Sequence, residues 1–204
     1  MFSILSSLLL IFFFLIRKNR NKEKRLWVIF FYVLLSFVFD ILHSIFNAQR
    51  FKIYFLSLFS ITEYSFLSVF FLMVFRDIRF KRLVIFCYPI FLFVAIYSLI
   101  YEKKVDFDYL SAPIEAILII VFSILFFYEQ LINPEVTFIY ASKSFWIVTA
   151  CLIYFSATLF LFISTAYLSN DQQKVYWPIN DVANIIKNIF FAIAFNRLLI
   201  NARK

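Results

Sequence analysis

The sequence contains no glycine among its 204 residues, and this absence removes several classes of chemistry. Phosphate-binding loops, dinucleotide-binding turns and the nucleophile elbow of hydrolases all need glycine where the backbone turns tightly or approaches a ligand. Enzymes built on those loops are therefore excluded. The chain also has a single histidine and two cysteines, and the cysteines lack metal-ligand spacing. We expect no disulfide framework, no metal site and no cofactor.

Charged residues are scarce as well, at 16%, whereas 64% of the residues are hydrophobic and 23% are aromatic. A water-soluble domain averages about 45–50% apolar and about 25% charged residues. A chain of this composition has more apolar surface than a single core can bury. The composition therefore predicts that much of the surface faces lipid.

Apolar runs separated by charged residues predict an all-α fold, a polytopic membrane helix bundle with seven transmembrane helices. Connections are short, so residues 1–204 form a single transmembrane domain in which sequence neighbours pack antiparallel. The first run has 15 residues and rises only about 22 Å as a helix, so whether it spans fully is open. The expected spans are approximately 2–16, 26–46, 53–75, 83–101, 110–132, 144–168 and 176–200.

The distribution of Lys and Arg predicts the orientation of the bundle, because positive charge is retained on the cytoplasmic side. Fourteen of the 20 Lys and Arg residues fall in one set of loops and helix ends, and five fall in the opposite set. This bias places the N-terminus outside and the C-terminus inside. It also accounts for the net charge of +8 without nucleic acid. Anionic lipid headgroups or a cytoplasmic partner remain open as further roles for these residues.

Ionisable side chains within the expected spans are the main functional clue, because such groups are costly in a membrane. Ser36, Asp40, His43 and Asn47 form one helical stripe. By helical rise, the acids and bases of four spans lie at similar depths. They predict a pocket whose inner boundary is an ion pair of Lys187 with Glu63 or Asp40. A structural role in fixing helix register stays the alternative. The candidate residues of a polar pocket in the outer half are Asp40, His43, Glu63, Glu115, Asp181, Asn184 and Lys187.

Two other features are expected to be structural. Glu129 lies beside Gln130, where we expect the solvated inner end of a span. The tyrosines and phenylalanines are expected to face lipid or to pack.

Several functional classes remain possible for such a bundle. A membrane hydrolase with a carboxylate-rich site would normally use several histidines. A retinal protein would place an aspartate four residues before the lysine of the last helix, where this chain has Ala183. A small ion- or proton-coupled transporter would use buried carboxylates, although internal repeats are absent. A sensor or accessory protein would need only a ligand-responsive core and a cytoplasmic partner.

Three short segments carry a resemblance to a known group of proteins. They are Glu63-Tyr64-Ser65-Phe66, Phe145-Trp146-Ile147-Val148 with Tyr154-Phe155-Ser156, and the segment Asn184-Ile185-Ile186-Lys187-Asn188-Ile189. These resemble segments of uncharacterised seven-span inner-membrane proteins of Bacteroidota, often encoded beside histidine kinases. The resemblance implies a sensory or accessory component of envelope signalling in the bacterial cytoplasmic (inner) membrane, with a histidine kinase as partner. It names no ligand and no catalytic residue.

Overall fold

The computed structural model describes residues 2–16, 23–45, 49–101, 110–134, 138–165 and 178–196. Within these ranges the chain forms seven α-helices and one short 3-10 helix, and no strand. The expectation of an all-helical fold is therefore confirmed for the described residues. The helices are α1 (Phe2–Ile16), α2 (Lys24–Ile45), α3 (Gln49–Val74), α4 (Ile78–Tyr101), α5 (Ser111–Ile132), α6 (Lys143–Thr165) and α8 (Pro178–Asn196), with η1 (Ile139–Ala141) before α6.

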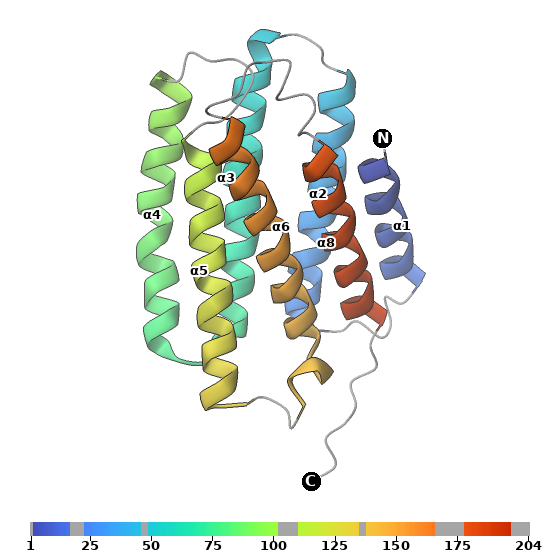
Figure 1. Ribbon diagram of the computed structural model, residues 1–204, viewed down its shortest axis with the longest axis vertical. Helices are drawn as coiled ribbons and strands as arrows, with labels where there is room; N and C mark the ends of the chain where they lie inside the picture. Colours follow the sequence, from blue (N-terminus) through green and yellow to red (C-terminus); the bar gives the residue numbers. More distant parts are fainter. Residues whose placement is uncertain are drawn as a thin grey trace.

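The helices lie side by side along the long axis of the molecule, and successive helices run in opposite directions (Figure 1). One end of the bundle carries most of the described basic side chains, and we call it the basic end. It lies at the bottom of Figure 1, where α2, α4 and α6 begin. Its basic residues are Lys24, Arg25, Arg76, Arg79, Lys81, Arg82 and Lys143.

Five of the helices are long and apolar enough to cross a membrane, as in a multi-pass membrane protein. The surface agrees, since large apolar side chains such as Phe86 and Phe93 of α4 are 67% and 72% exposed. The apolar stretch of α1, Leu5–Ile16, is shorter, and α8 falls outside this set. Seven spans and the orientation of the termini therefore stay predictions. The five segments are Lys24–Leu42, Leu56–Val74, Ile78–Ile100, Ser111–Ile132 and Lys143–Ile163.

The short helix α1 is held against α2 and α8 by rings and by polar contacts. Phe14 is fully buried, stacks on Phe30 of α2 at 4.2 Å and meets Phe195 of α8 edge to face at 4.8 Å. Between α8 and α1, Asn188 Nδ2 donates to Ser6 Oγ (2.7 Å) and to Ser7 Oγ (3.1 Å). Amide-to-hydroxyl bonds of this kind join helices where lipid offers no alternative partner.

Helix α4 begins five residues earlier than expected from the sequence, at Ile78. Asp77 precedes the helix, and its Oδ1 accepts the backbone N–H of Arg79 at 2.8 Å, which is the geometry of an N-cap. The basic residues that follow therefore belong to the first turns of α4 and not to a loop. The expected span of 83–101 lies within this helix and begins later, because charge was taken to mark its end.

The position of Glu129 differs from the solvated helix end that the sequence predicted. Its side chain is 3% exposed and lies in the interior, not at a solvated helix end. The carboxylate accepts the backbone N–H of Arg76 at 3.0 Å and that of Asp77 at 2.6 Å. Both donors lie in the turn between α3 and α4, so a side chain of α5 satisfies backbone groups that the turn leaves unpaired.

Candidate functional site

Four side chains from four helices meet in the interior, and we call them the central cluster: Tyr32 of α2, Glu63 of α3, Tyr154 of α6 and Lys187 of α8. Lys187 Nζ donates a hydrogen bond to Tyr32 Oη at 2.7 Å. Tyr32 Oη in turn donates to Glu63 Oε1 at 2.5 Å. The ammonium also lies over the ring of Tyr154, 3.9 Å from its centroid. The ammonium group is thus stabilised by the Tyr32 hydroxyl, which is bonded to the Glu63 carboxylate, and by the face of the Tyr154 ring.

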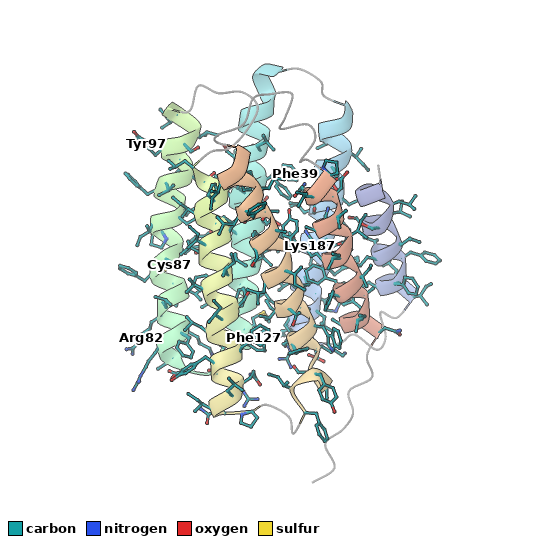
Figure 2. All side chains as sticks on the ribbon, in the orientation of Figure 1. Phe39, Arg82, Cys87, Tyr97, Phe127 and Lys187 are labelled. Atoms are coloured by element: carbon teal, nitrogen blue, oxygen red, sulfur yellow. The ribbon has the colours of Figure 1, made fainter. Side chains whose placement is uncertain are left out.

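The central cluster is enclosed. The exposed fractions are 1% for Tyr32, 4% for Glu63, 8% for Tyr154 and 2% for Lys187. Figure 2 shows Lys187 about midway along the bundle, between Phe39 toward one end and Arg82 toward the other. By helical rise, Glu63 lies about 21 Å from Gln49, where α3 begins, and about 16 Å from Val74, where it ends. A hydrogen-bonded ionic group therefore lies in the middle of the apolar helices.

Lys187 also interacts with carboxylates outside the central cluster. Lys187 interacts electrostatically with Glu63, Asp40 and Glu115, which come from α3, α2 and α5. Glu115 is 2% exposed. Asp40 is partly buried, and its Oδ2 is enclosed with no hydrogen-bond partner. Lys187 thus interacts with carboxyl groups of three other helices, while the polar pocket itself stays a prediction.

The remaining candidates lie at the edge of this arrangement or outside the described part. Asp181 is partly buried in the first turn of α8 and interacts electrostatically with Asp40. Asn184 is buried, at 8% exposure, between Asp181 and Lys187 along α8. The side chain of His43 lies outside the described residues.

Tyr32 and Tyr154 are site residues that the sequence reasoning missed, because tyrosines were assigned to packing. The expected direct pair of Lys187 with a carboxylate is replaced by a contact through the Tyr32 hydroxyl. A signal for Tyr32 did exist. It lies four residues before Ser36 and eight before Asp40, and so extends their polar stripe by one helical turn. Tyr154 has no comparable mark in the sequence.

A second group of polar residues joins α2 and α6 at the basic end, and we call it the basic-end cluster: Glu23, Arg25, Lys143 and Ser144. Arg25 Nε donates to Glu23 Oε2 at 2.7 Å, and Arg25 Nη1 donates to Ser144 Oγ at 3.0 Å. Lys143 Nζ lies 3.3 Å from Glu23 Oε1. The start of α6 is thereby tied to the start of α2.

This arrangement shifts the titration of Glu23. Partial burial alone would raise the pKa of Glu23, but the hydrogen bond and charge of Arg25, together with the charge of Lys143, lower it below its ordinary value. The folded state therefore favours the ionised carboxylate. The contribution to stability is fully present above the pKa of the unfolded chain and is lost as the pH falls through the folded pKa.

We expect Glu23→Gln to reduce this acid sensitivity. In unfolding experiments on the protein in detergent, the stability difference between the original chain and Glu23→Gln should be largest at neutral pH and shrink as the pH falls through the titration of Glu23. Asp77→Asn, at another helix start of the basic end, is the matched control. A difference that stays constant down to low pH would contradict the assignment.

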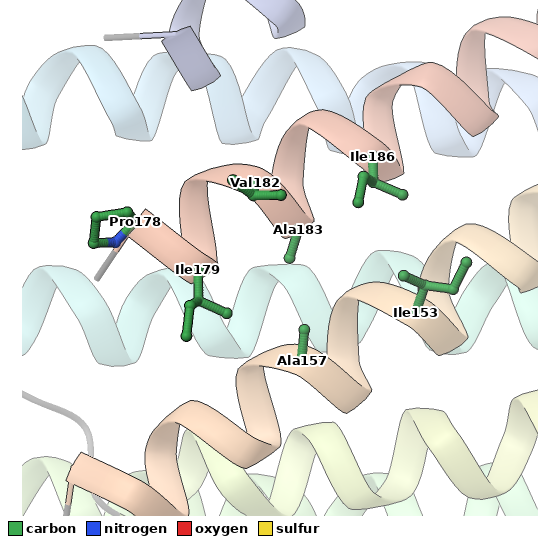
Figure 3. A pocket seen from close by; sticks show the side chains of 7 residues that line it. All are labelled: Ile153, Ala157, Pro178, Ile179, Val182, Ala183 and Ile186. Atoms are coloured by element: carbon green, nitrogen blue, oxygen red, sulfur yellow. The ribbon is translucent and has the colours of Figure 1, made fainter. Parts of the chain in front are cut away.

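The structure also has an apolar groove of about 300 Å³ between α6 and α8. Figure 3 shows the side chains that line it coming from these two helices. None of the seven candidate residues belongs to this lining, so the groove lends no support to the predicted polar pocket. The lining residues are Ile153, Ala157, Pro178, Ile179, Val182, Ala183 and Ile186.

The chemistry open to the central cluster is the binding and movement of protons. A phenol between an ammonium and a carboxylate can pass a proton along its hydrogen bonds. In the described part of the chain, no three His, Cys, Asp or Glu side chains gather closely enough to hold a metal ion. The side chains that converge are therefore suited to protons and to electrostatic coupling between helices.

Comparison with protein families, curated proteins and solved structures gives no match for this chain.

Proposed function

We propose that this chain is a sensory or accessory component of envelope signalling in the bacterial cytoplasmic membrane, with the central cluster as its switching element. One observation carries the proposal. The helices α2 and α6 each contribute one residue to the central cluster, and both take part in the basic-end cluster, α6 with Lys143 and Ser144 and α2 with Arg25, next to Glu23 just before the helix. A change in the interior therefore acts on the same two helices that are tied together at the end facing a cytoplasmic partner.

The separation between the two clusters suits this role. Tyr32 lies seven residues after Arg25, about 10 Å by helical rise, and Tyr154 lies eleven residues after Lys143, about 16 Å. An α-helix is stiff over such lengths. A rotation or tilt at the central cluster is thus carried to the basic end as rigid-body motion of a helix, which is a common form of switching.

A membrane sensor is favoured over the two alternatives. A transporter must open its binding site to each side in turn, whereas the described members of the central cluster are enclosed and bonded to each other. A carboxylate-rich hydrolase must bind an attacking water among groups that activate it, often on a metal. A two-state signalling core needs no such opening, because a shift between two arrangements of the same helices is sufficient.

The basic end supplies the surface for partners. Arg76, Arg79 and Arg82 are exposed around the start of α4. Anionic lipid headgroups at the membrane surface and a signalling protein such as a histidine kinase are the partners we propose, the latter on the resemblance in sequence. Nucleic acid is not proposed as a partner.

The proposal is tested by measuring whether the central cluster controls the basic end. Spin labels placed by Lys24→Cys and Tyr140→Cys, in a chain with Cys87→Ala and Cys151→Ala, report the distance between α2 and η1 beside α6. We expect Tyr32→Phe to change this distance distribution in lipid nanodiscs, because it removes the hydroxyl between Lys187 and Glu63. The control Tyr128→Phe, which alters an exposed tyrosine of α5, should leave it unchanged.

Identical distance distributions in the original chain and in Tyr32→Phe would contradict a switching role. A proton or ion flux through liposomes containing the purified protein, lost in Tyr32→Phe, would favour the transporter instead.

A further inference from the structure

The apolar groove between α6 and α8 lies beside one contact of the central cluster. Ile153 and Ile186, which line the groove, each precede a cluster residue, Tyr154 on α6 and Lys187 on α8. Successive residues of a helix point about 100° apart. The groove and the contact of Lys187 with the Tyr154 ring therefore lie on neighbouring sides of the same helix pair. A group that fills the groove acts on the spacing of the two helices that hold this contact.

The groove is open at the surface, and small side chains form its base. Figure 3 shows Ala157 of α6 and Ala183 of α8 pointing toward each other. Ala183 is 3% exposed, whereas Ile179 and Val182 at the border of the groove are 36% and 54% exposed. The two alanines leave the space and the larger side chains border it. The groove is thus a surface feature that the surrounding medium can enter.

The surroundings of the groove are apolar as well. Its α6 residues, Ile153 and Ala157, lie in the apolar segment Lys143–Ile163. Phe160, seven residues after Ile153 and so on the same face of α6, is 62% exposed, and Ile189 of α8 is 53% exposed. By helical rise, Ala157 lies about 21 Å from the start of α6 at the basic end. The groove therefore faces the hydrocarbon of the bilayer, in the half of the bundle away from the basic end.

Water and empty space are poor occupants of this groove. A buried water molecule needs about two to four polar partners, and the described lining residues are all apolar. An empty groove of about 300 Å³ would forfeit the dispersion contacts of the side chains that line it. The occupant is therefore expected to be apolar.

The size of the groove excludes a docked helix. One turn of an α-helix with its side chains fills roughly 400–600 Å³, from a diameter of about 10–12 Å and a pitch of about 5.4 Å. The groove of about 300 Å³ holds less than that. A protein interface also takes about 20–30 residues on each side, whereas seven described residues line the groove. A single flexible chain is the apolar shape that remains.

We propose that the groove binds one acyl chain of a bilayer phospholipid and that this chain sets the spacing of α6 and α8 at the central cluster. An acyl chain is thin, flexible and apolar, so it fits a narrow aliphatic groove without a polar partner. Because lipid is as apolar as the groove, close packing and not transfer from water supplies the affinity. The lipid site goes beyond the proposed function, and its effect on the central cluster rests on that function.

A phospholipid with a photoreactive diazirine midway along one acyl chain tests the site, in nanodiscs that contain the full chain. After irradiation, mass spectrometry of peptides measures the lipid label on each helix. We expect severalfold more label per exposed area at the groove than at Phe86 and Phe93, which face bulk lipid on α4.

Variants that fill the groove should remove this excess. Ala157→Phe fills it from α6, and Val182→Phe fills it from an exposed position of α8 without altering a buried residue. The matched control is Ile163→Phe, which enlarges an exposed side chain of α6 outside the groove and should keep the excess.

Three results would overturn the lipid site. One is label at the groove no greater than at Phe93 in the original chain, a measurement that needs no variant to fold. Another is an excess of label that Ala157→Phe and Val182→Phe both keep. The third is a disulfide between two copies of Val182→Cys, in the chain with Cys87→Ala and Cys151→Ala, which would assign the groove to a second copy.

The effect on the central cluster has a separate measurement. In the spin-labelled chain, Ala157→Phe should change the distance distribution between Lys24→Cys and Tyr140→Cys, and Ile163→Phe should not. If Tyr32→Phe changes this distribution and Ala157→Phe does not, the groove has no part in the switch and the proposed function stands. If neither changes it, the proposed function fails, while the labelling experiment still decides the lipid site.

Discussion

Replacement of Lys187 by methionine is expected to lower the free energy of unfolding by about 3–5 kcal/mol, the range for breaking one side of a buried ionic pair. Methionine keeps the length of the side chain but removes the charge. Glu63 and Tyr32 would then keep their mutual hydrogen bond in the interior without the ammonium that compensates it. The loss is measured by reversible unfolding of the purified protein in mixed detergent micelles.

A double-mutant cycle separates this effect from packing. Glu63→Gln in the Lys187→Met background removes the unpaired charge and should recover part of the lost stability. Lys81→Met, on α4 near the basic end, serves as the matched control and should change stability by less than about 0.5 kcal/mol. A Lys187→Met variant as stable as Lys81→Met would show that the lysine is dispensable to the folded state.

Removal of the Glu129 side chain is expected to have the second largest effect. In Glu129→Ala the backbone N–H groups of Arg76 and Asp77 lose a charged acceptor, and each such bond contributes about 1.5–3 kcal/mol. We expect a loss of about 3 kcal/mol, together with faster hydrogen exchange at these two amides. Thermal or detergent unfolding and amide exchange measure the two effects.

Two milder variants calibrate this prediction. Glu129→Gln keeps an uncharged acceptor and should cost less than Glu129→Ala. Asp77→Ala removes only the N-cap of α4, which is typically worth about 1 kcal/mol. If all three variants had equal stability, the carboxylate would not be holding the turn between α3 and α4.

Patterns along a single helix were sufficient to predict much of this arrangement. Length and hydropathy identify the apolar helices, because a spanning segment has to be apolar over most of its length. Helical rise alone brought Glu63 and Lys187 to one depth, and they are joined through Tyr32. These inferences succeed because depth in a bundle follows directly from residue number.

Contacts between distant helices were not predictable in this way. Glu129 meets backbone groups 52 and 53 residues away, and no residue type in the sequence marks a backbone N–H that needs an acceptor. Tyr154 faces Lys187 and not lipid because of the rotation of α6, which depends on packing. With 12 tyrosines in the chain, residue type alone does not distinguish those that bind a charge.

The polarity of α8 has a consequence for how the protein is made. This helix carries Lys187 together with Asp181, Asn184 and Asn188, and it is not among the helices that are apolar enough to span by composition. A lysine at the centre of a lone inserting helix costs about 2.5–3.5 kcal/mol on insertion scales. The partners of Lys187 on α2, α3 and α6 are all synthesised earlier, so during translation α8 is expected to enter the bilayer against helices already inserted there.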